Sequence, residues 1–212
     1  MSGRSPRWIS VKRGTPLGDM ELGTLVKLNE NGTPAEFYVA CHNYEAGLNG
    51  NGRTLVVRKD SYDERVFSNS NNAYASSSLD AFLTGPYFNL LDAGIREKAG
   101  TTKFYYTPGG YDTVTTLERA VFQLSLTELG RPASYANTEG TALPIASTLQ
   151  IAHRNGAAVE QWTRSPRKNT NQVCFLYQDG YVGAEYYNQY KGSRPAFTLP
   201  ASTLVGDDQL IA

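Results

Sequence analysis

The sequence is poor in the residue types that build metal, cofactor or redox sites. Its 212 residues include only two cysteines, two histidines, two methionines and two tryptophans. His42 and His153 lie far apart and outside any metal-ligand spacing, so neither a zinc site nor a cofactor is expected. Cys41 and Cys174 lie in apolar, strand-like runs. This favours buried free thiols, although a disulfide between them stays open at the sequence level.

Charge and long apolar runs are also scarce. Charged residues make up 19% of the chain and the formal net charge is zero, which argues against nucleic acid as a partner. No polybasic run indicates binding to anionic lipid. No run reaches membrane-spanning length and residues 1–8 lack the apolar core of a signal peptide, so we expect synthesis in the cytoplasm without membrane insertion.

Glycine, tyrosine and small polar residues are abundant instead. The chain has 20 glycines and 14 tyrosines, a composition typical of short strands, turns and ordered loops. The length suits one α+β domain, expected over residues 21–212. Residues 1–20 combine scattered arginine and lysine with proline and glycine, which predicts an extended arm. It is interpreted as either a flexible terminus or an attachment arm that orders on a partner.

Local patterns predict several elements along the first two thirds of the chain. Residues 22–28 and 36–41 flank an Asn31-Gly32 pair, which predicts a β-hairpin, with a third strand at 54–59. Serines at 76–78 cap a short helix that Gly85-Pro86 should end, and a second helix should close at Gly100. Further predictions are strands at 104–106 and 117–124, a capping box from Ser125 to Glu128, and a long loop over 131–160 with one helical turn near 146–151.

The last third carries the most distinctive pattern. Two strand-like runs, 173–177 and 181–183, flank the turn Asp179-Gly180, and a tyrosine-dense segment follows them. Trp162 is expected in the core. Arg164 and Arg194 are expected to be half-buried, where they would pair with carbonyls or carboxylates and fix loops.

Two segments that contain these residues, which we call the anchors, resemble segments of known protein families. The segments Trp162-Thr163-Arg164-Ser165-Pro166 and Gly192-Ser193-Arg194-Pro195-Ala196 resemble the ending of a family of phage, prophage and bacterial surface proteins. The ending is also similar to that of C-type-lectin-fold proteins of the formylglycine-generating-enzyme type, which include variable proteins diversified by retroelements. The resemblance covers roughly residues 20–205 and implies a C-type-lectin-like fold.

The resemblance also implies roles for residues. The structural anchors would be Trp162, Arg164, Gly192, Arg194 and Pro195, and side chains between the anchors would form a ligand face. The residues in that stretch are Asn169, Asn171, Tyr177, Tyr181, Tyr186, Tyr187, Asn188 and Tyr190. Tyrosine offers a large contact area with little rotamer entropy to lose, so it suits a binding surface. The alternative is that these tyrosines pack a twisted sheet.

The sequence offers no catalytic constellation. No cysteine matches the cysteine site of the formylglycine-generating enzymes, so their activity is not expected here. The closest carboxylates, Asp60 with Asp63 and Glu64, and Asp207 with Asp208, are interpreted as solvated charge. The tripeptides Glu-Pro-Asn and Gln-Pro-Asp of calcium-dependent lectins are missing, which argues against such a site, while calcium in a loop stays open.

The expected function is therefore binding rather than catalysis. The first hypothesis is a phage virion accessory protein, attached to other virion proteins by its arm, that binds a host surface glycan or protein. Its location would be the virion, with the bacterial cell surface as the alternative, and it would be a homo-oligomer. The second hypothesis is a structural decoration or cement protein that uses the same face for assembly. An enzyme acting on cell-wall glycan ranks last.

Overall fold

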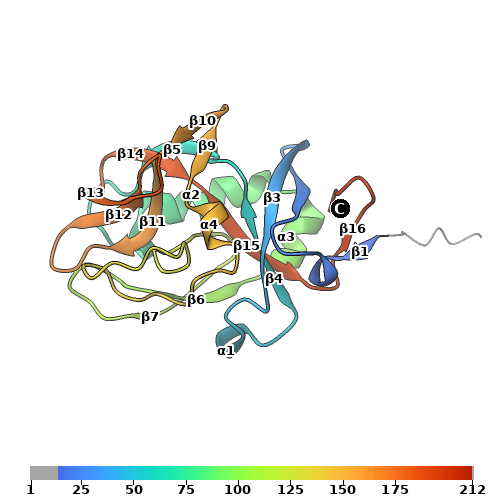
Figure 1. The fold of residues 1–212 in the computed structure, drawn as a ribbon, viewed down its shortest axis with the longest axis horizontal. Coiled ribbons are helices and arrows are strands. Elements are labelled where there is room, and N and C mark those ends of the chain that lie inside the picture. The colour runs from blue at the N-terminus through green and yellow to red at the C-terminus, as the bar shows by residue number, and fades with distance from the viewer. Residues whose placement is uncertain (1–13, 212) are drawn as a thin grey trace, which may run out of the picture.

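Two five-stranded sheets organise the computed structural model, which describes residues 14–211 (Figure 1). The first sheet has the order β2-β3-β4-β15-β8 and is antiparallel. Its strands are β2 (Leu25–Glu30), β3 (Thr33–His42), β4 (Arg53–Arg58), β15 (Pro195–Pro200) and β8 (Phe122–Gln123). The hairpin predicted around Asn31-Gly32 is confirmed as β2–β3. Both turn residues have positive φ, 50° and 76°, as a two-residue hairpin turn requires.

The second sheet has the order β13-β12-β11-β14-β5. Its strands are β13 (Val182–Tyr186), β12 (Gln172–Leu176), β11 (Gln161–Pro166), β14 (Tyr190–Ser193) and β5 (Asp63–Val66). Only the pairing of β11 with β14 is parallel. β14 and β15 are separated by Arg194 alone, so one stretch of chain passes from the second sheet into the first.

Three small two-stranded antiparallel sheets accompany the two larger ones. They are β1 (Thr15–Pro16) with β16 (Leu204–Val205), β6 (Thr102–Tyr106) with β7 (Thr115–Arg119), and β9 (Ala152–Arg154) with β10 (Ala157–Val159). Leu17 is fully buried and donates its N–H to the carbonyl of Thr203 at 2.8 Å. The folded domain therefore begins by Thr15, before the boundary expected at residue 20. Residues 1–13 of the expected arm lie outside the described residues.

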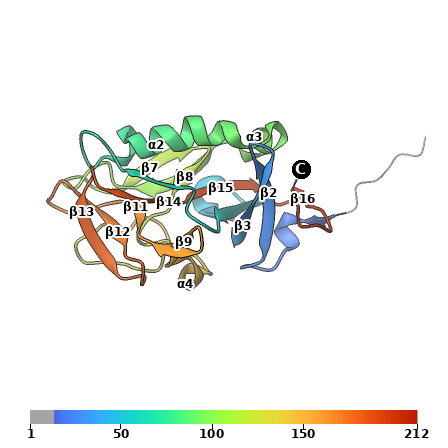
Figure 2. The same cartoon turned by 90° about the horizontal axis from the view of Figure 1, so that it is seen from above.

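A row of short helical segments over residues 78–99 covers one face of the molecule, above β15, and the helix at 146–149 lies on the opposite side (Figure 2). The α-helices are α1 (Ala46–Asn49), α2 (Ser78–Phe82), α3 (Ala93–Ala99) and α4 (Ala146–Leu149); 3₁₀ turns cover Leu17–Asp19, Tyr74–Ser76 and Phe88–Leu90, and a π turn covers Leu83–Tyr87. The predicted serine cap is confirmed, because the side chain of Ser77 accepts from the N–H of Asp80 at 3.0 Å. The row buries Leu79, Leu83 and Ile95. No helix among residues 14–211 is long and apolar enough to cross a membrane.

Three local predictions were wrong in part. Gly85-Pro86 does not end the helical row, because the wider π turn accommodates a proline that cannot donate a hydrogen bond. The strand expected over 117–124 is divided between β7 and β8, which belong to different sheets. The loop expected over 131–160 contains α4 as predicted, but also the β9–β10 hairpin. The Asn155-Gly156 pair, where both residues have positive φ, could have predicted this hairpin from the sequence.

Candidate functional site

The first anchor is fixed by burial on all sides. Trp162 is fully buried, packs edge-on against Phe67 and Phe175, and donates its indole N–H to the carbonyl of Arg65 at 3.0 Å. A buried indole with a satisfied N–H is a core residue and offers no platform to a ligand.

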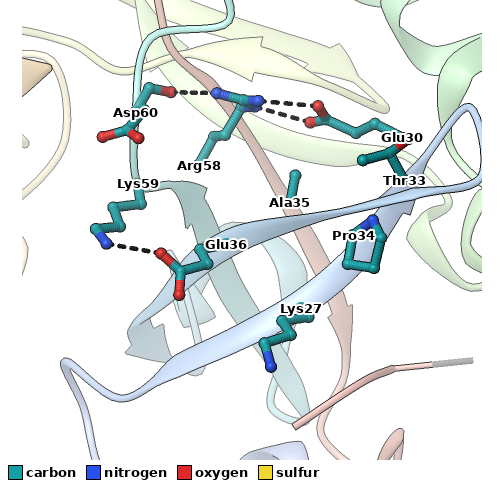
Figure 3. Close-up of a pocket in the computed structure, with 9 residues that line it drawn as sticks. All are labelled: Lys27, Glu30, Thr33, Pro34, Ala35, Glu36, Arg58, Lys59 and Asp60. Atoms are coloured by element: carbon teal, nitrogen blue, oxygen red, sulfur yellow. Dashed lines mark hydrogen bonds and ion pairs between the residues drawn. The ribbon is translucent and has the colours of Figure 1, made fainter. Parts of the chain in front are cut away.

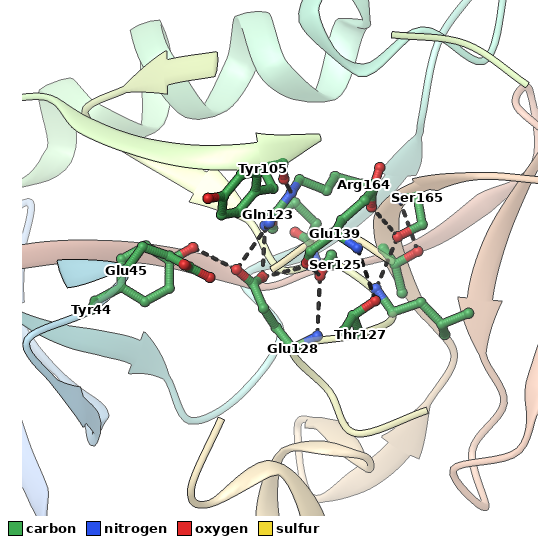
Figure 4. A network of polar contacts seen from close by, with 12 residues as sticks. Tyr44, Glu45, Tyr105, Gln123, Ser125, Thr127, Glu128, Glu139, Arg164 and Ser165 are labelled. Carbon is green, nitrogen blue, oxygen red and sulfur yellow. Dashed lines mark hydrogen bonds and ion pairs between the residues drawn. The ribbon is translucent and has the colours of Figure 1, made fainter. Parts of the chain in front are cut away.

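Arg164, which belongs to the same anchor as Trp162, lies at the centre of a closed polar network (Figure 4). Its guanidinium makes two parallel bonds to Glu128, Nη1 to Oε2 at 2.7 Å and Nη2 to Oε1 at 2.9 Å, and both side chains are fully buried. Tyr44 donates its hydroxyl to the same carboxylate at 2.5 Å. Burial alone would lower the pKa of Arg164, but Glu128 and Tyr44 raise it above its ordinary value. Arg164 is therefore charged and fully paired.

The predicted capping box supplies the network with its carboxylate. Ser125 N–H donates to Glu128 Oε2 at 2.8 Å, and Glu128 N–H donates to Ser125 Oγ at 3.1 Å. A second buried carboxylate, Glu139, accepts from Thr107 N–H at 2.5 Å and from the hydroxyl of Ser165. Burial raises the pKa of Glu139. Neither glutamate is exposed, so the network stabilises the fold and cannot reach a substrate.

The other anchor uses carbonyls instead of carboxylates. The guanidinium of Arg194 is fully buried and donates to the carbonyls of Arg58, Leu149 and Lys59 at 2.7, 2.8 and 2.7 Å. Without a paired carboxylate, burial lowers the pKa of Arg194 to about 10. Because its partners come from the end of β4 and from α4, this side chain ties the β14–β15 junction to both of these segments.

Gly192 and Pro195 complete this anchor, and both are buried. A Cβ on Gly192 would lie 2.6 Å from Ser61 Oγ and 2.9 Å from the carbonyl of Glu160, so no larger residue fits. The five anchor residues, Trp162, Arg164, Gly192, Arg194 and Pro195, are thus all buried. The two arginines are more deeply buried than the half-buried state expected from the sequence.

Most of the expected ligand residues between the anchors are exposed to solvent. Tyr177, Tyr181, Tyr186 and Tyr190 are 44%, 68%, 58% and 72% exposed. Asn169, Asn171 and Asn188 are also exposed, whereas Tyr187 is half-buried and packs against the core.

These residues do not form one continuous cluster. Tyr177 and Tyr181 lie at the tip of the β12–β13 hairpin, where Tyr177 N–H donates to the carbonyl of Tyr181 at 2.8 Å. Tyr186 pairs with Gln172 at the opposite end of the hairpin, next to Asn171. Tyr190 lies on β14 and pairs with Val66. Tertiary structure thus divides most of the expected face between the tip and the base of the hairpin, and Tyr190 lies outside the hairpin on β14.

A buried lysine holds the hairpin in place. Lys191 is 3% exposed, and its Nζ lies 2.6 Å from Glu160 Oε2 and 2.8 Å from Glu185 Oε2. The same ammonium lies 3.8 Å from the ring centre of Phe175 on β12. One side chain therefore ties β12 and β13 to the start of β11, which gives the exposed tyrosines a rigid base.

The loop over residues 131–137 follows the hairpin and was not singled out from the sequence. Lys168 N–H donates to the carbonyl of Tyr135 at 2.7 Å, and Ala136 forms a bridge with Arg167. Arg131, at the other end of the loop, lies beside Gly180 at the hairpin tip. The available sequence signal was the presence of arginine, tyrosine and lysine in the two polar segments around 131–135 and 167–168. No local pattern indicated that these two segments contact each other.

Two carboxylates of the first cluster considered for catalysis, Asp63 and Glu64, are held in ion pairs. Asp63 accepts from Arg65 and from the hydroxyl of Ser193 at 2.6 Å; burial opposes its charge, but these donors lower its pKa. Glu64 lies 3.5 Å from Arg154. Carboxylates bound to their own cations are poorly suited to serve as an acid–base pair.

A pocket of about 490 Å³ opens beside β3 and β4 (Figure 3). Its charged lining is largely matched within itself: Arg58 binds Glu30 at 2.9 and 3.0 Å, and Lys59 binds Glu36 at 2.6 Å. The pocket lining therefore carries equal numbers of cations and carboxylates, of which Lys27 and Asp60 stand outside these two pairs.

Both cysteines are free thiols, with Cys174 buried and Cys41 partly buried. Burial, together with the neighbouring Glu139, raises the pKa of Cys174 to about 12, so the thiolate is disfavoured. Both ring nitrogens of His42 are engaged, by Thr54 at 3.0 Å and by the carbonyl of Met20 at 2.9 Å. Within residues 14–211, no group of three potential ligands could hold a metal ion.

Residues 51–201 match the family model DUF6273, a domain of unknown function, and the chain belongs to this family. The match runs from β4 to β15 and so includes both anchors and the hairpin between them. The searches of curated proteins and of solved structures found no match.

Proposed function

We propose that this chain is a non-enzymatic binding domain with a C-type-lectin-like fold, which uses its tyrosine- and asparagine-rich segment to bind a surface glycan or protein of a bacterial host. The observation that carries the proposal is the exposure of Tyr177, Tyr181, Tyr186 and Tyr190 in or beside a sheet whose strands β12 and β14 otherwise bury most of their side chains. Tyrosines that merely packed a sheet would be covered, and these are not.

The scaffold supports this role. The loops and the hairpin are held by buried polar side chains, Arg164, Lys191 and Arg194, so little ordering entropy would be lost when a ligand binds. Binding residues commonly lie on turns that a rigid framework positions.

The setting we propose follows the family resemblance of the two anchors. The domain would be an accessory protein of a phage tail or capsid, attached to other virion proteins through its N-terminal residues and present in several copies. The alternative is a decoration protein in which the same tyrosines contact neighbouring subunits.

The test is binding to host cells and to a glycan array by the intact protein and by a variant carrying Tyr181→Ala, Tyr186→Ala and Tyr190→Ala. Leu204→Ala, a 42% exposed residue on β16, is the control. We expect the triple variant to lose binding and the control to keep it. Self-association of the intact protein that the triple variant abolishes, without any binding to cells or glycans, would favour the decoration role instead.

A further inference from the structure

Arg131 places a guanidinium at the tip of the β12–β13 hairpin. Its Nη2 lies 3.5 Å from the position that a Cβ on Gly180 would occupy, between the exposed Tyr177 and Tyr181 in the chain. Its Nε is buried without a hydrogen-bond partner. The turn also borders a pocket of about 270 Å³, lined by Tyr177, Gln178 and Asp179. The guanidinium is thus held against the turn by packing, with hydrogen-bonding capacity left over.

Two more cations lie at the base of the hairpin. The guanidinium of Arg167 lies 5.2 Å from the ring centre of Tyr135 and donates to the side chain of Gln172 at 2.8 Å. Lys168 follows it and is half-exposed. Burial raises the pKa of Tyr135, as do the neighbouring Cys174 and Tyr177, while Arg167 lowers it. Tyr135 therefore lies beside Arg167, and its carbonyl also accepts from Lys168, so it links the two cations at the base of the hairpin.

We call Arg131, Tyr135, Arg167, Lys168 and Tyr177 the cationic strip. Its three cations form no ion pair with any carboxylate within residues 14–211, whereas eight other cations there do: Arg58, Lys59, Arg65, Lys103, Arg119, Arg154, Arg164 and Lys191. The acidic residue at the tip, Asp179, accepts from the N–H of Tyr181 at 3.1 Å and forms no ion pair with Arg131.

The length of the strip limits its ligand. Tyr177 at the tip lies five positions after Gln172 at the base, and five strand steps span roughly 17 Å. A single small anion cannot contact both ends. A chain that carries a negative group every few units can, and its rings can lie against tyrosine.

We propose that the ligand of this hairpin is an anionic polysaccharide, with carboxylate or phosphate groups on its repeating units, that lies along the cationic strip. This inference rests on the proposed binding function and names its ligand class. Nucleic acid shares the charge but is the less suitable occupant. The whole chain has zero net charge, and three cations are a small footprint for a nucleic-acid site.

The experiment compares the intact protein with Arg131→Glu/Lys168→Glu and with the control Lys27→Glu/Lys103→Glu, which changes net charge equally on cations outside the strip. The probes are polygalacturonate (carboxylate), poly(glycerol phosphate), neutral galactan and duplex DNA. Binding constants are measured across a NaCl series, after circular dichroism has shown each variant to be folded.

The intact protein should bind one of the two anionic polymers, and which one it binds identifies the carboxylate or the phosphate. The strip variant should weaken this binding about tenfold or more and reduce the slope of log K against log salt by about two, one for each cation removed. The control variant should keep both values.

The inference would be overturned if neutral galactan or duplex DNA bound as tightly as the anionic polymer. It would also be overturned if the control variant lost as much affinity for that polymer as the strip variant. If the tyrosine triple variant loses binding to a neutral glycan while the strip variant keeps it, the proposed function stands and the anionic ligand class fails. If no polymer binds and no host cell binds, both fail.

Discussion

The two anchors and the segment between them belong to one stretch of about 35 residues, yet the anchors bury their large side chains and the segment between them exposes its own. Trp162 and Arg194 are 0% and 2% exposed, while Tyr181 and Tyr190 are 68% and 72% exposed. The anchors direct large polar side chains inward and give each of them hydrogen-bond partners there. The segment between them leaves large amphipathic side chains in solvent. The comparison teaches that aromatic content alone does not mark the core of this domain.

Within the anchors, the two arginines show two ways to bury a guanidinium. Arg164 is neutralised by Glu128, and its pKa is raised, whereas Arg194 is surrounded by neutral carbonyls and its pKa is lowered to about 10. A guanidinium held by carbonyls fixes backbone positions, and one held by a carboxylate fixes another side chain. Arg194 therefore joins segments, and Arg164 joins β11 to the turn at Ser125.

Removing Arg164 should give the largest effect on the anchors. Arg164→Ala leaves the fully buried carboxylate of Glu128 unpaired, so we expect a loss of about 3–5 kcal/mol in the free energy of unfolding, measured by urea denaturation. The double variant Arg164→Met/Glu128→Leu removes both charges and should recover part of that loss. A loss below about 1 kcal/mol for Arg164→Ala would show that the ion pair is open to water.

A smaller effect is expected at Gly192. Gly192→Ala places a methyl group 2.6 Å from Ser61 Oγ, and overpacking of this kind costs about 1–3 kcal/mol. Gly47→Ala is the matched control, because nothing lies within 4 Å of its Cβ position. Urea denaturation of both variants checks the prediction, and equal stabilities would contradict the close approach of β14 to Ser61.

Glu139 should make the stability of the anchors depend on pH. Its pKa is raised in the folded state, so the protonated form is favoured by folding. That stabilisation is complete below the ordinary glutamate pKa of about 4.3 and is lost as pH rises through the folded pKa. The melting temperature of the wild type should therefore fall relative to that of Glu139→Gln as pH is raised from about 4 toward neutrality. A constant difference between the two proteins, or one of opposite sign, would contradict this.

The smallest effect on stability is expected in the exposed segment. Tyr181→Ala and Tyr190→Ala remove no buried contact of a core residue, so each should change the free energy of unfolding by no more than about 0.5 kcal/mol. Thermal and urea unfolding measure this directly. A loss above about 1 kcal/mol at either tyrosine would mean that the segment belongs to the scaffold, and the contrast with the anchors would disappear.

Local signals predicted much of the first sheet and little of the site. The Asn31-Gly32 turn, the cap at Ser77 and the capping box at Ser125 were all readable because each depends on residues within a few positions. The division of residues 117–124 could not be predicted, since β7 pairs with β6 while β8 pairs with the distant β15, and Arg119 at the end of β7 binds Asp80 of α2 at 2.9–3.0 Å.

The sequence by itself determined which residues could serve as anchors and which could be displayed, because turn geometry, capping and side-chain chemistry are local properties. Only the tertiary structure decided that Glu128 pairs with Arg164, that most of the expected ligand residues divide between the tip and the base of the hairpin, and that the loop over 131–137 brings Arg131 to Gly180. These outcomes depend on pairings between distant segments, which are selected by packing and by the cost of leaving a buried charge unpaired.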